Sequence, residues 1–108
     1  MMSRLVSLLF LLVLVAPAWG KTPVHEIEIR DHLFHPEELH IPAHTKVKLV
    51  VYNRDSTPEE FESYELNREK VIMGGRKANI FIGPLAPGIY PFFGEFNPKT
   101  AQGKVIVE

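Results

Sequence analysis

Carboxylates and imidazoles are the side chains of this chain whose chemistry suits metal ions. Five glutamates lie between residues 59 and 69, and all five histidines lie between residues 25 and 44. Carboxylate oxygens are hard donors that suit ferric iron, manganese or calcium, whereas imidazoles also suit divalent copper and nickel. The two groups make metal binding a hypothesis, and the simpler alternative for the glutamates is a solvated acidic surface.

Three neighbouring glutamates are the first candidate ligands. If residues 59–63 are extended, alternate side chains point to opposite faces. Glu60 and Glu62 then share one face, while Glu59 and Phe61 lie on the other. We therefore name Glu59, Glu60 and Glu62 as candidate metal ligands, of which no more than two converge easily.

Two histidines form the second candidate group. His32 and His35, with Asp31 beside them, would offer two imidazoles to divalent copper or nickel. The pattern lacks a third and fourth ligand in sequence, and exposed histidines are common near strand ends. His25 alternates with Ile27 and Ile29, which predicts a partly buried strand residue.

Residues for catalysis are scarce. Beyond residue 20 the only serines are Ser56 and Ser63, and the chain has no cysteine to act as a nucleophile. Gly74-Gly75 lacks the lysine and hydroxyl spacing of a phosphate-binding loop. We expect no enzymatic activity.

The first 20 residues predict export. Arg4 precedes the apolar run 5–15, and a small-residue stretch follows, with cleavage expected after Ala18 or Gly20. The run is shorter than the roughly 20 residues that span a bilayer, so we expect a cleavable signal peptide at 1–20 and no membrane insertion after cleavage. The sequence thus predicts an exported protein with one domain at 21–108.

Composition bounds what that domain can be. The formal net charge of -1 becomes -2 once Arg4 is removed, which argues against a nucleic-acid partner. A domain of this size buries about 60% of its unfolded surface. Because there is no cysteine, its stability must come from packing, hydrogen bonding or a bound ligand.

Short alternating segments separated by turn residues predict an all-β fold. The clearest core strand is 45–53, with Val47, Leu49 and Val51 on one face. Residues 64–70 are compatible with one helical turn. The other predicted strands are 24–30, 37–41, 59–63, 77–82, 88–93 and 103–108. About seven strands indicate a sandwich or barrel.

A turn followed by a tyrosine is the most specific structural signal. In Leu85-Ala86-Pro87-Gly88-Ile89-Tyr90, the tyrosine enters a strand directly after the turn. This pattern predicts a tyrosine corner, in which the hydroxyl bonds back to the backbone and fixes a Greek-key crossover. The alternative is a ligand or redox role for Tyr90.

Several motifs together resemble the periplasmic cupredoxin-like proteins that accompany ferrous-iron permeases. The resemblance covers nearly all of residues 21–108 and extends to the N-terminal module of a larger periplasmic iron-uptake protein. It implies a periplasmic location and a single Greek-key β-sandwich or barrel of cupredoxin type. The motifs that carry it are Phe34-x-Pro36, Ile41-Pro42-Ala43, Asn53, residues 58–63, Leu85-x-Pro87-Gly88-x-Tyr90, Phe92-Phe93 and residues 100–107.

The resemblance also indicates where a copper ion would bind. Cupredoxins that carry electrons use a histidine before the middle strands and a cysteine, histidine and methionine in the last loop. The corresponding positions here are Glu59 (or Glu60 after a shift of one), Gly94, Asn97 and Ala101. The iron-uptake proteins often have an acidic residue and a histidine at the positions of Gly94 and Asn97, and Glu95 would supply the acidic residue after a shift of one. Since a thiolate is indispensable to blue copper, we expect no type 1 copper centre.

Three functions follow as expectations. The first is an accessory of iron or copper uptake that binds or relays an iron or copper ion, with an inner-membrane iron permease or its periplasmic partners as the partner that the resemblance implies. The second is a metal-free interaction module that docks onto such an assembly. The third is a periplasmic copper carrier that uses His32 and His35.

Overall fold

The computed structural model describes residues 21–108, so the predicted signal peptide at 1–20 lies outside the described residues. These residues contain no helix, and therefore none long and apolar enough to cross a membrane. They form nine strands: β1 Val24–Arg30, β2 Leu33–His35, β3 Glu38–Ile41, β4 Val47–Asn53, β5 Glu59–Ser63, β6 Arg68–Ile72, β7 Lys77–Ile82, β8 Gly88–Gly94 and β9 Gln102–Val107.

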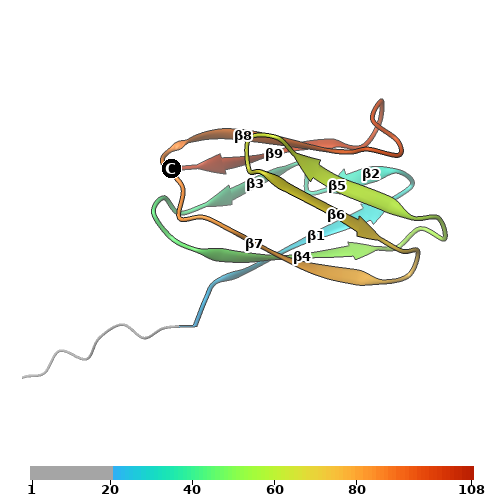
Figure 1. Ribbon diagram of the computed structural model, residues 1–108, viewed down its shortest axis with the longest axis horizontal. Coiled ribbons are helices and arrows are strands. Elements are labelled where there is room, and N and C mark those ends of the chain that lie inside the picture. Colours follow the sequence, from blue (N-terminus) through green and yellow to red (C-terminus); the bar gives the residue numbers. More distant parts are fainter. Residues whose placement is uncertain (1–20) are drawn as a thin grey trace, which may run out of the picture.

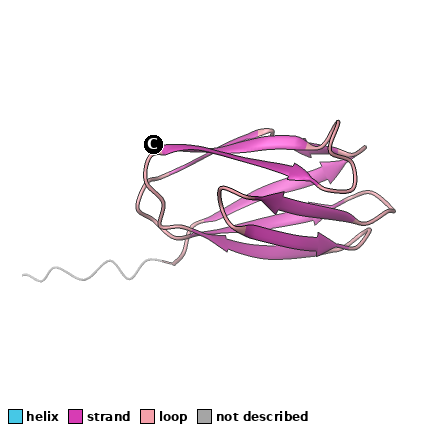
Figure 2. Ribbon diagram, turned by 45° about the horizontal axis from the view of Figure 1, so that its top comes forward, coloured by secondary structure: helices cyan, strands magenta, loops and turns pink. Residues whose placement is uncertain are grey.

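The strands form two sheets that pack face to face (Figures 1 and 2). One sheet has the order β2-β1-β4-β7, and the other has the order β3-β9-β8-β5-β6. β1 runs parallel to β4 and β3 runs parallel to β9, while the other pairs are antiparallel. The prediction of an all-β sandwich is confirmed, with nine strands in place of about seven.

Side chains that alternate along the strands fill the space between the sheets. On β4, Val47, Leu49 and Val51 are fully buried, as the alternation predicts. Three phenylalanines, Phe34, Phe61 and Phe92, pack together at the centre, with ring centroids 4.9 to 6.1 Å apart. Each aromatic ring buries a large apolar area, so this cluster ties β2 to β5 and β8.

The chain has a strand that the sequence pattern did not reveal. β2 has only three residues, and Pro36 follows it. It forms a hairpin with β1 through Asp31 and His32, which both adopt left-handed backbone conformations (φ 55° and 59°). Two left-handed residues are typical of a type I′ turn, which usually carries Asn-Gly rather than Asp-His.

The expected helical turn within residues 64–70 is wrong. Residues 64–67 form a tight turn and β6 follows it, paired with β5. Asn67 adopts a left-handed conformation (φ 55°), which breaks a right-handed helix. The Ser63 hydroxyl accepts a hydrogen bond from the backbone N–H of Leu66 at 3.0 Å, which stabilises the turn.

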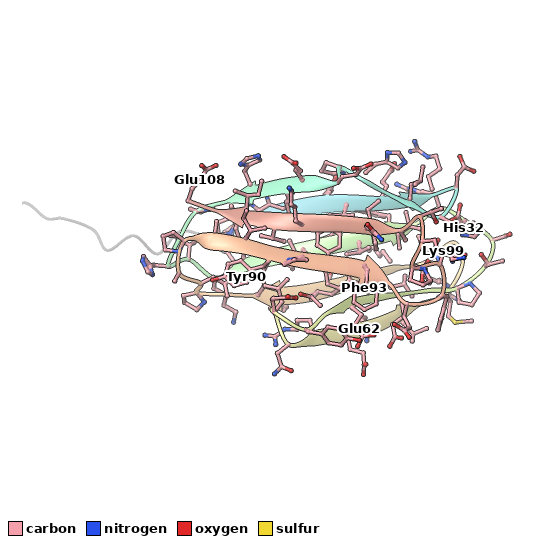
Figure 3. All side chains as sticks on the ribbon, turned by 90° about the horizontal axis from the view of Figure 1, so that it is seen from above. His32, Glu62, Tyr90, Phe93, Lys99 and Glu108 are labelled. Atoms are coloured by element: carbon pink, nitrogen blue, oxygen red, sulfur yellow. The ribbon has the colours of Figure 1, made fainter. Side chains whose placement is uncertain are left out.

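The tyrosine corner is confirmed. The Tyr90 hydroxyl donates a hydrogen bond to the carbonyl of Ala86 at 2.8 Å. This contact holds the chain where it enters β8, and β8 carries Gly94 at its other end. Tyr90 and Glu108 lie toward one end of the sandwich, and His32 and Lys99 lie at the other (Figure 3).

Candidate functional site

Glu59 begins β5 with its side chain directed into the protein, where only 1% of the residue is exposed. The turn before it is held by Asn53, which is equally buried. The Asn53 amide donates to the carbonyls of Thr57 (2.8 Å) and Ile72 (3.0 Å) and accepts from the backbone N–H of Asp55 (3.0 Å). The Asn53 side chain therefore ties together the turn that leads into Glu59.

The four positions that the resemblance assigns to copper ligands come together in the structure. The Asn97 amide donates to Oε2 of Glu59 at 2.7 Å. A Cβ placed on Gly94 would lie 2.6 Å from Cδ of Glu59 and 2.7 Å from Cβ of Ala101. The register therefore assigns Glu59 and Gly94, rather than Glu60 and Glu95, to these positions.

These residues do not fit a type 1 copper ion. Gly94 and Ala101 offer no side-chain donor atom, and the chain has no cysteine. Both oxygens of Glu59 accept hydrogen bonds from protein N–H groups: Oε1 from the backbone of Glu60 and Phe96 (2.9 Å each), and Oε2 from Asn97. The Glu59 carboxylate lies against Gly94 and Asn97 and is bonded to donors of the protein itself.

A second group of carboxylates lies on the outer face of the same sheet. Glu60, Glu62 and Glu69 each offer an oxygen, and these three atoms lie within 4.8 Å of one another. Glu62 lies opposite Glu69 on β6 and opposite Phe93 on β8. Figure 3 shows Glu62 and Phe93 on this side of the molecule. We call Glu60, Glu62 and Glu69 the outer carboxylate cluster.

Burial and mutual repulsion raise the pKa values of two members of the outer carboxylate cluster. Partial burial, a hydrogen bond with Glu69 and the negative charges of Glu69, Glu60 and Glu95 raise the pKa of Glu62 to about 7. Partial burial, followed by the charges of Glu69, Glu95 and Glu59, also raises the pKa of Glu60. A cation would relieve this repulsion, because an opposite charge favours the ionised form of a carboxyl.

The structure places the five predicted ligands at four separate locations. Glu60 and Glu62 share a face, as alternation predicts, and Glu59 points to the other side of β5. His32 lies at the exposed tip of the β1–β2 hairpin, with Nδ1 3.5 Å from Oδ2 of Asp55. His35 is exposed on β2 opposite Glu28. Among residues 21–108, neither histidine belongs to a group of three candidate ligands.

Sequence reasoning did not select Glu69 or the pairing of Glu59 with Asn97. Glu69 joins the outer carboxylate cluster only because β6 pairs with β5 in one particular register. A strand at 68–72 would put Glu69 and Val71 on one face, but no local pattern gives the register that sets Glu69 opposite Glu62. The Glu59–Asn97 contact spans 38 positions and depends on the loop after β8, which no local pattern encodes.

Comparison with known proteins gives a family and one sequence relative. A family model described as a cupredoxin-like domain matches residues 4–107. An uncharacterized protein of Rickettsia prowazekii (strain Madrid E) is 48% identical over 82 residues, which are 76% of this chain. The match spans 66% of that protein, just under two thirds of its length.

Solved structures share the fold at low identity. Auracyanin A, a "blue" copper protein from Chloroflexus aurantiacus, superposes with a TM-score of 0.71 at 15% identity, covering 82% of this chain and all of that one. A purple cupredoxin from Nitrosopumilus maritimus gives 0.60 at 22% identity, covering 77% and 98%. A reduced amicyanin variant gives 0.66 at 18% identity, covering 84% and 88%. At such identities the likeness establishes the fold alone.

Proposed function

The chain belongs to the cupredoxin-like domain family, and from this we propose that it is a periplasmic accessory protein of iron or copper uptake. In this proposal it binds or relays a metal ion without a blue-copper centre. Its role is binding and transfer, not catalysis. The partner we propose is an inner-membrane iron permease or one of its periplasmic components, on the strength of the sequence motifs described above.

The observation that carries the proposal is the outer carboxylate cluster. Three oxygens within 4.8 Å of one another match the spacing of ligands around a single ion. Glu60 and Glu62 are held by β5, and Glu69 is held opposite Glu62 by β6. Because strands position side chains more firmly than loops do, the three groups are largely in place before an ion arrives.

The chemistry of the cluster suits a weak and exchangeable site. Carboxylate oxygens favour hard ions such as ferric iron over cuprous copper. Glu69 is exposed and the other two are half-buried, so water would complete the coordination and a partner could reach the ion. A protein that passes a metal on needs a site of this kind rather than a closed one.

Calorimetric titration tests the proposal. The purified protein is titrated with cupric, ferrous and ferric ions, with iron kept soluble by a weak competing chelator of known affinity. The same titration is run on Glu60→Gln/Glu62→Gln, which keeps the side-chain shapes but removes two charges. We expect saturable binding of one ion per chain in the original protein and a loss of at least about tenfold in affinity in the variant.

A matched control separates ligation from general charge. Glu26→Gln/Glu37→Gln removes two negative charges from exposed positions outside the cluster. We expect it to bind the ion like the original protein. Equal affinity in the original protein and in Glu60→Gln/Glu62→Gln would rule the cluster out as the site, and the absence of saturable heat with every ion would rule out the metal-binding function.

A second candidate function is a metal-free interaction module that docks onto the same transport assembly. The observation that favours it is the Glu59 carboxylate, which stands at a position that the resemblance assigns to a copper ligand and which is bonded within the protein. Capture of a partner from envelope extract in the presence of a strong chelator would support this function. Capture that depends entirely on added metal would refute it.

A further inference from the structure

The loop between β8 and β9, residues 95–101, is attached to β5 through the buried side chain of Glu59 and through one backbone hydrogen bond, from the N–H of Glu95 to the carbonyl of Glu60 (2.9 Å). Oε1 of Glu59 accepts the backbone N–H of Phe96, and Oε2 accepts the side-chain amide of Asn97. The third donor, the backbone N–H of Glu60, belongs to β5 itself. The carboxylate therefore joins β5 to two loop residues, Phe96 and Asn97, which follow Glu59 by 37 and 38 positions.

The loop is also closed on itself around the same point. The backbone N–H of Asn97 donates to the carbonyl of Gly94 (3.1 Å), and that of Ala101 donates to the carbonyl of Asn97 (2.9 Å). The N–H of Gly94 donates to the carbonyl of Ala101 (2.8 Å). Because Gly94 has no side chain, Glu59 and Ala101 can pack against it closely.

We infer that Glu59 is an internal cross-link that takes the structural place of a metal ion and orders the 95–101 loop without one. A buried carboxylate is stable only when its oxygens are satisfied, and here N–H donors satisfy both of them. Two of these bonds, from Phe96 and Asn97, hold the loop to the strand, as ligand bonds to an ion would.

The cross-link also prevents metal binding at this end of the protein. A cation approaching Glu59 would meet N–H groups directed at both oxygens, and two of the other three positions, Gly94 and Ala101, have no donor atom. The cross-link therefore excludes metal from this place and keeps the loop ordered in chelator. This conclusion is independent of whether the outer carboxylate cluster binds metal.

Amide hydrogen exchange at Phe96 tests the cross-link, because its N–H bonds directly to Glu59. In the original protein we expect the same protection in chelator and in the presence of cupric or ferric ions. In Glu59→Ala, exchange at Phe96 should rise by about tenfold or more, because the amide loses a charge-assisted bond. Glu59→Gln should lie between the two, since an amide keeps the shape and can still pair with a reoriented Asn97.

Asn97→Asp is a second variant that leaves Glu59 intact. It has the size of asparagine but replaces the N–H donor with another carboxylate, so repulsion should release the loop and raise exchange at Phe96. Glu95→Gln is the control, because it changes one charge in the same loop at an exposed residue that does not bond to Glu59. Asn97→Asp keeps the test decisive if Glu59→Ala does not fold.

Two results would overturn the inference. One is unchanged exchange at Phe96 in Asn97→Asp, and in Glu59→Ala where that variant folds. The other is protection in the original protein that disappears in chelator and returns with a metal ion, which would show that Glu59 serves an ion rather than replacing one.

Discussion

Glu62 and Glu69 occupy directly opposed positions on β5 and β6, so two carboxylates face each other on the outer surface of the sheet. Like charges in opposed positions of a strand pair destabilise the pair. The fold tolerates this because Glu62 can hold a proton: partial burial, with the bond and charge of Glu69, raises its pKa to about 7. The arrangement lowers stability wherever both groups are ionised.

Replacing Glu62 should stabilise the metal-free protein at neutral pH. Between the ordinary pKa of 4.5 and about 7, folded Glu62 keeps a proton that the unfolded chain releases. The contribution to stability is therefore present below about 4.5 and is lost as pH rises through about 7. Glu62→Gln has no proton to lose in this range. It should therefore be more stable than the original protein at about pH 8 and equally stable at about pH 4.

Urea unfolding in chelator at the two pH values measures this difference. Glu26→Gln, an exposed glutamate on β1, serves as the control and should show no such pH-dependent gain. A Glu62→Gln variant that is less stable than the original protein at about pH 8 would contradict the raised pKa.

Removing the Tyr90 hydroxyl should destabilise the domain slightly. Tyr90→Phe deletes the 2.8 Å hydrogen bond to the Ala86 carbonyl and leaves the ring in place. We expect a loss of about 1 kcal/mol in the free energy of unfolding, measured in urea. Tyr64→Phe is the control, because Tyr64 is 73% exposed. Equal losses of stability in the two variants would show that the hydrogen bond of Tyr90 does not contribute to stability.

Local patterns were sufficient for much of this fold. Alternation predicted the core strand with Val47, Leu49 and Val51, and a turn followed by Tyr90 predicted the corner. Alternation also placed Glu60 and Glu62 on one face, and the structure brings them together. In each case the signal lies within a few residues, so pairing between distant strands is not needed to detect it.

Local sequence patterns do not predict the features that depend on pairing between distant segments. Residues 64–70 contain glutamate, leucine, arginine and lysine, which are good helix formers, but a left-handed Asn67 and pairing with β5 make them a turn and a strand. Glu69 enters the candidate site only through that pairing. The contact of Glu59 with Asn97 likewise required both the position of β5 and the path of the 95–101 loop.

Truncating Phe61 should cause a large loss of stability. Phe61 is fully buried, and its ring stacks on Phe92 with centroids 4.9 Å apart. Phe61→Ala should cost about 3–5 kcal/mol, which is a large part of the total stability of about 5–15 kcal/mol that is typical of a domain. Phe81→Ala, at a position that is 44% exposed, should cost much less in the same urea experiment. Similar losses would show that the three-phenylalanine cluster does not dominate the core.

Adding one methyl group at Gly94 should destabilise the protein through Glu59. The new Cβ would lie 2.6 Å from Cδ of Glu59 and 2.7 Å from Cβ of Ala101, closer than such atoms can approach. Gly94→Ala should therefore cost about 1–3 kcal/mol, as overpacking of a core does. Gly88→Ala is the control, because its nearest heavy neighbour would be 3.5 Å away.

A double-mutant cycle identifies the contact responsible. If the clash is with the Glu59 carboxyl, Gly94→Ala should cost less in a Glu59→Ala background than in the original protein, and the difference is the coupling between the two positions. Urea unfolding of the four proteins measures it. Additive effects would mean that Ala101 alone resists the methyl group. Coupling would show that Gly94 is glycine because the carboxylate of Glu59 occupies the space beside it.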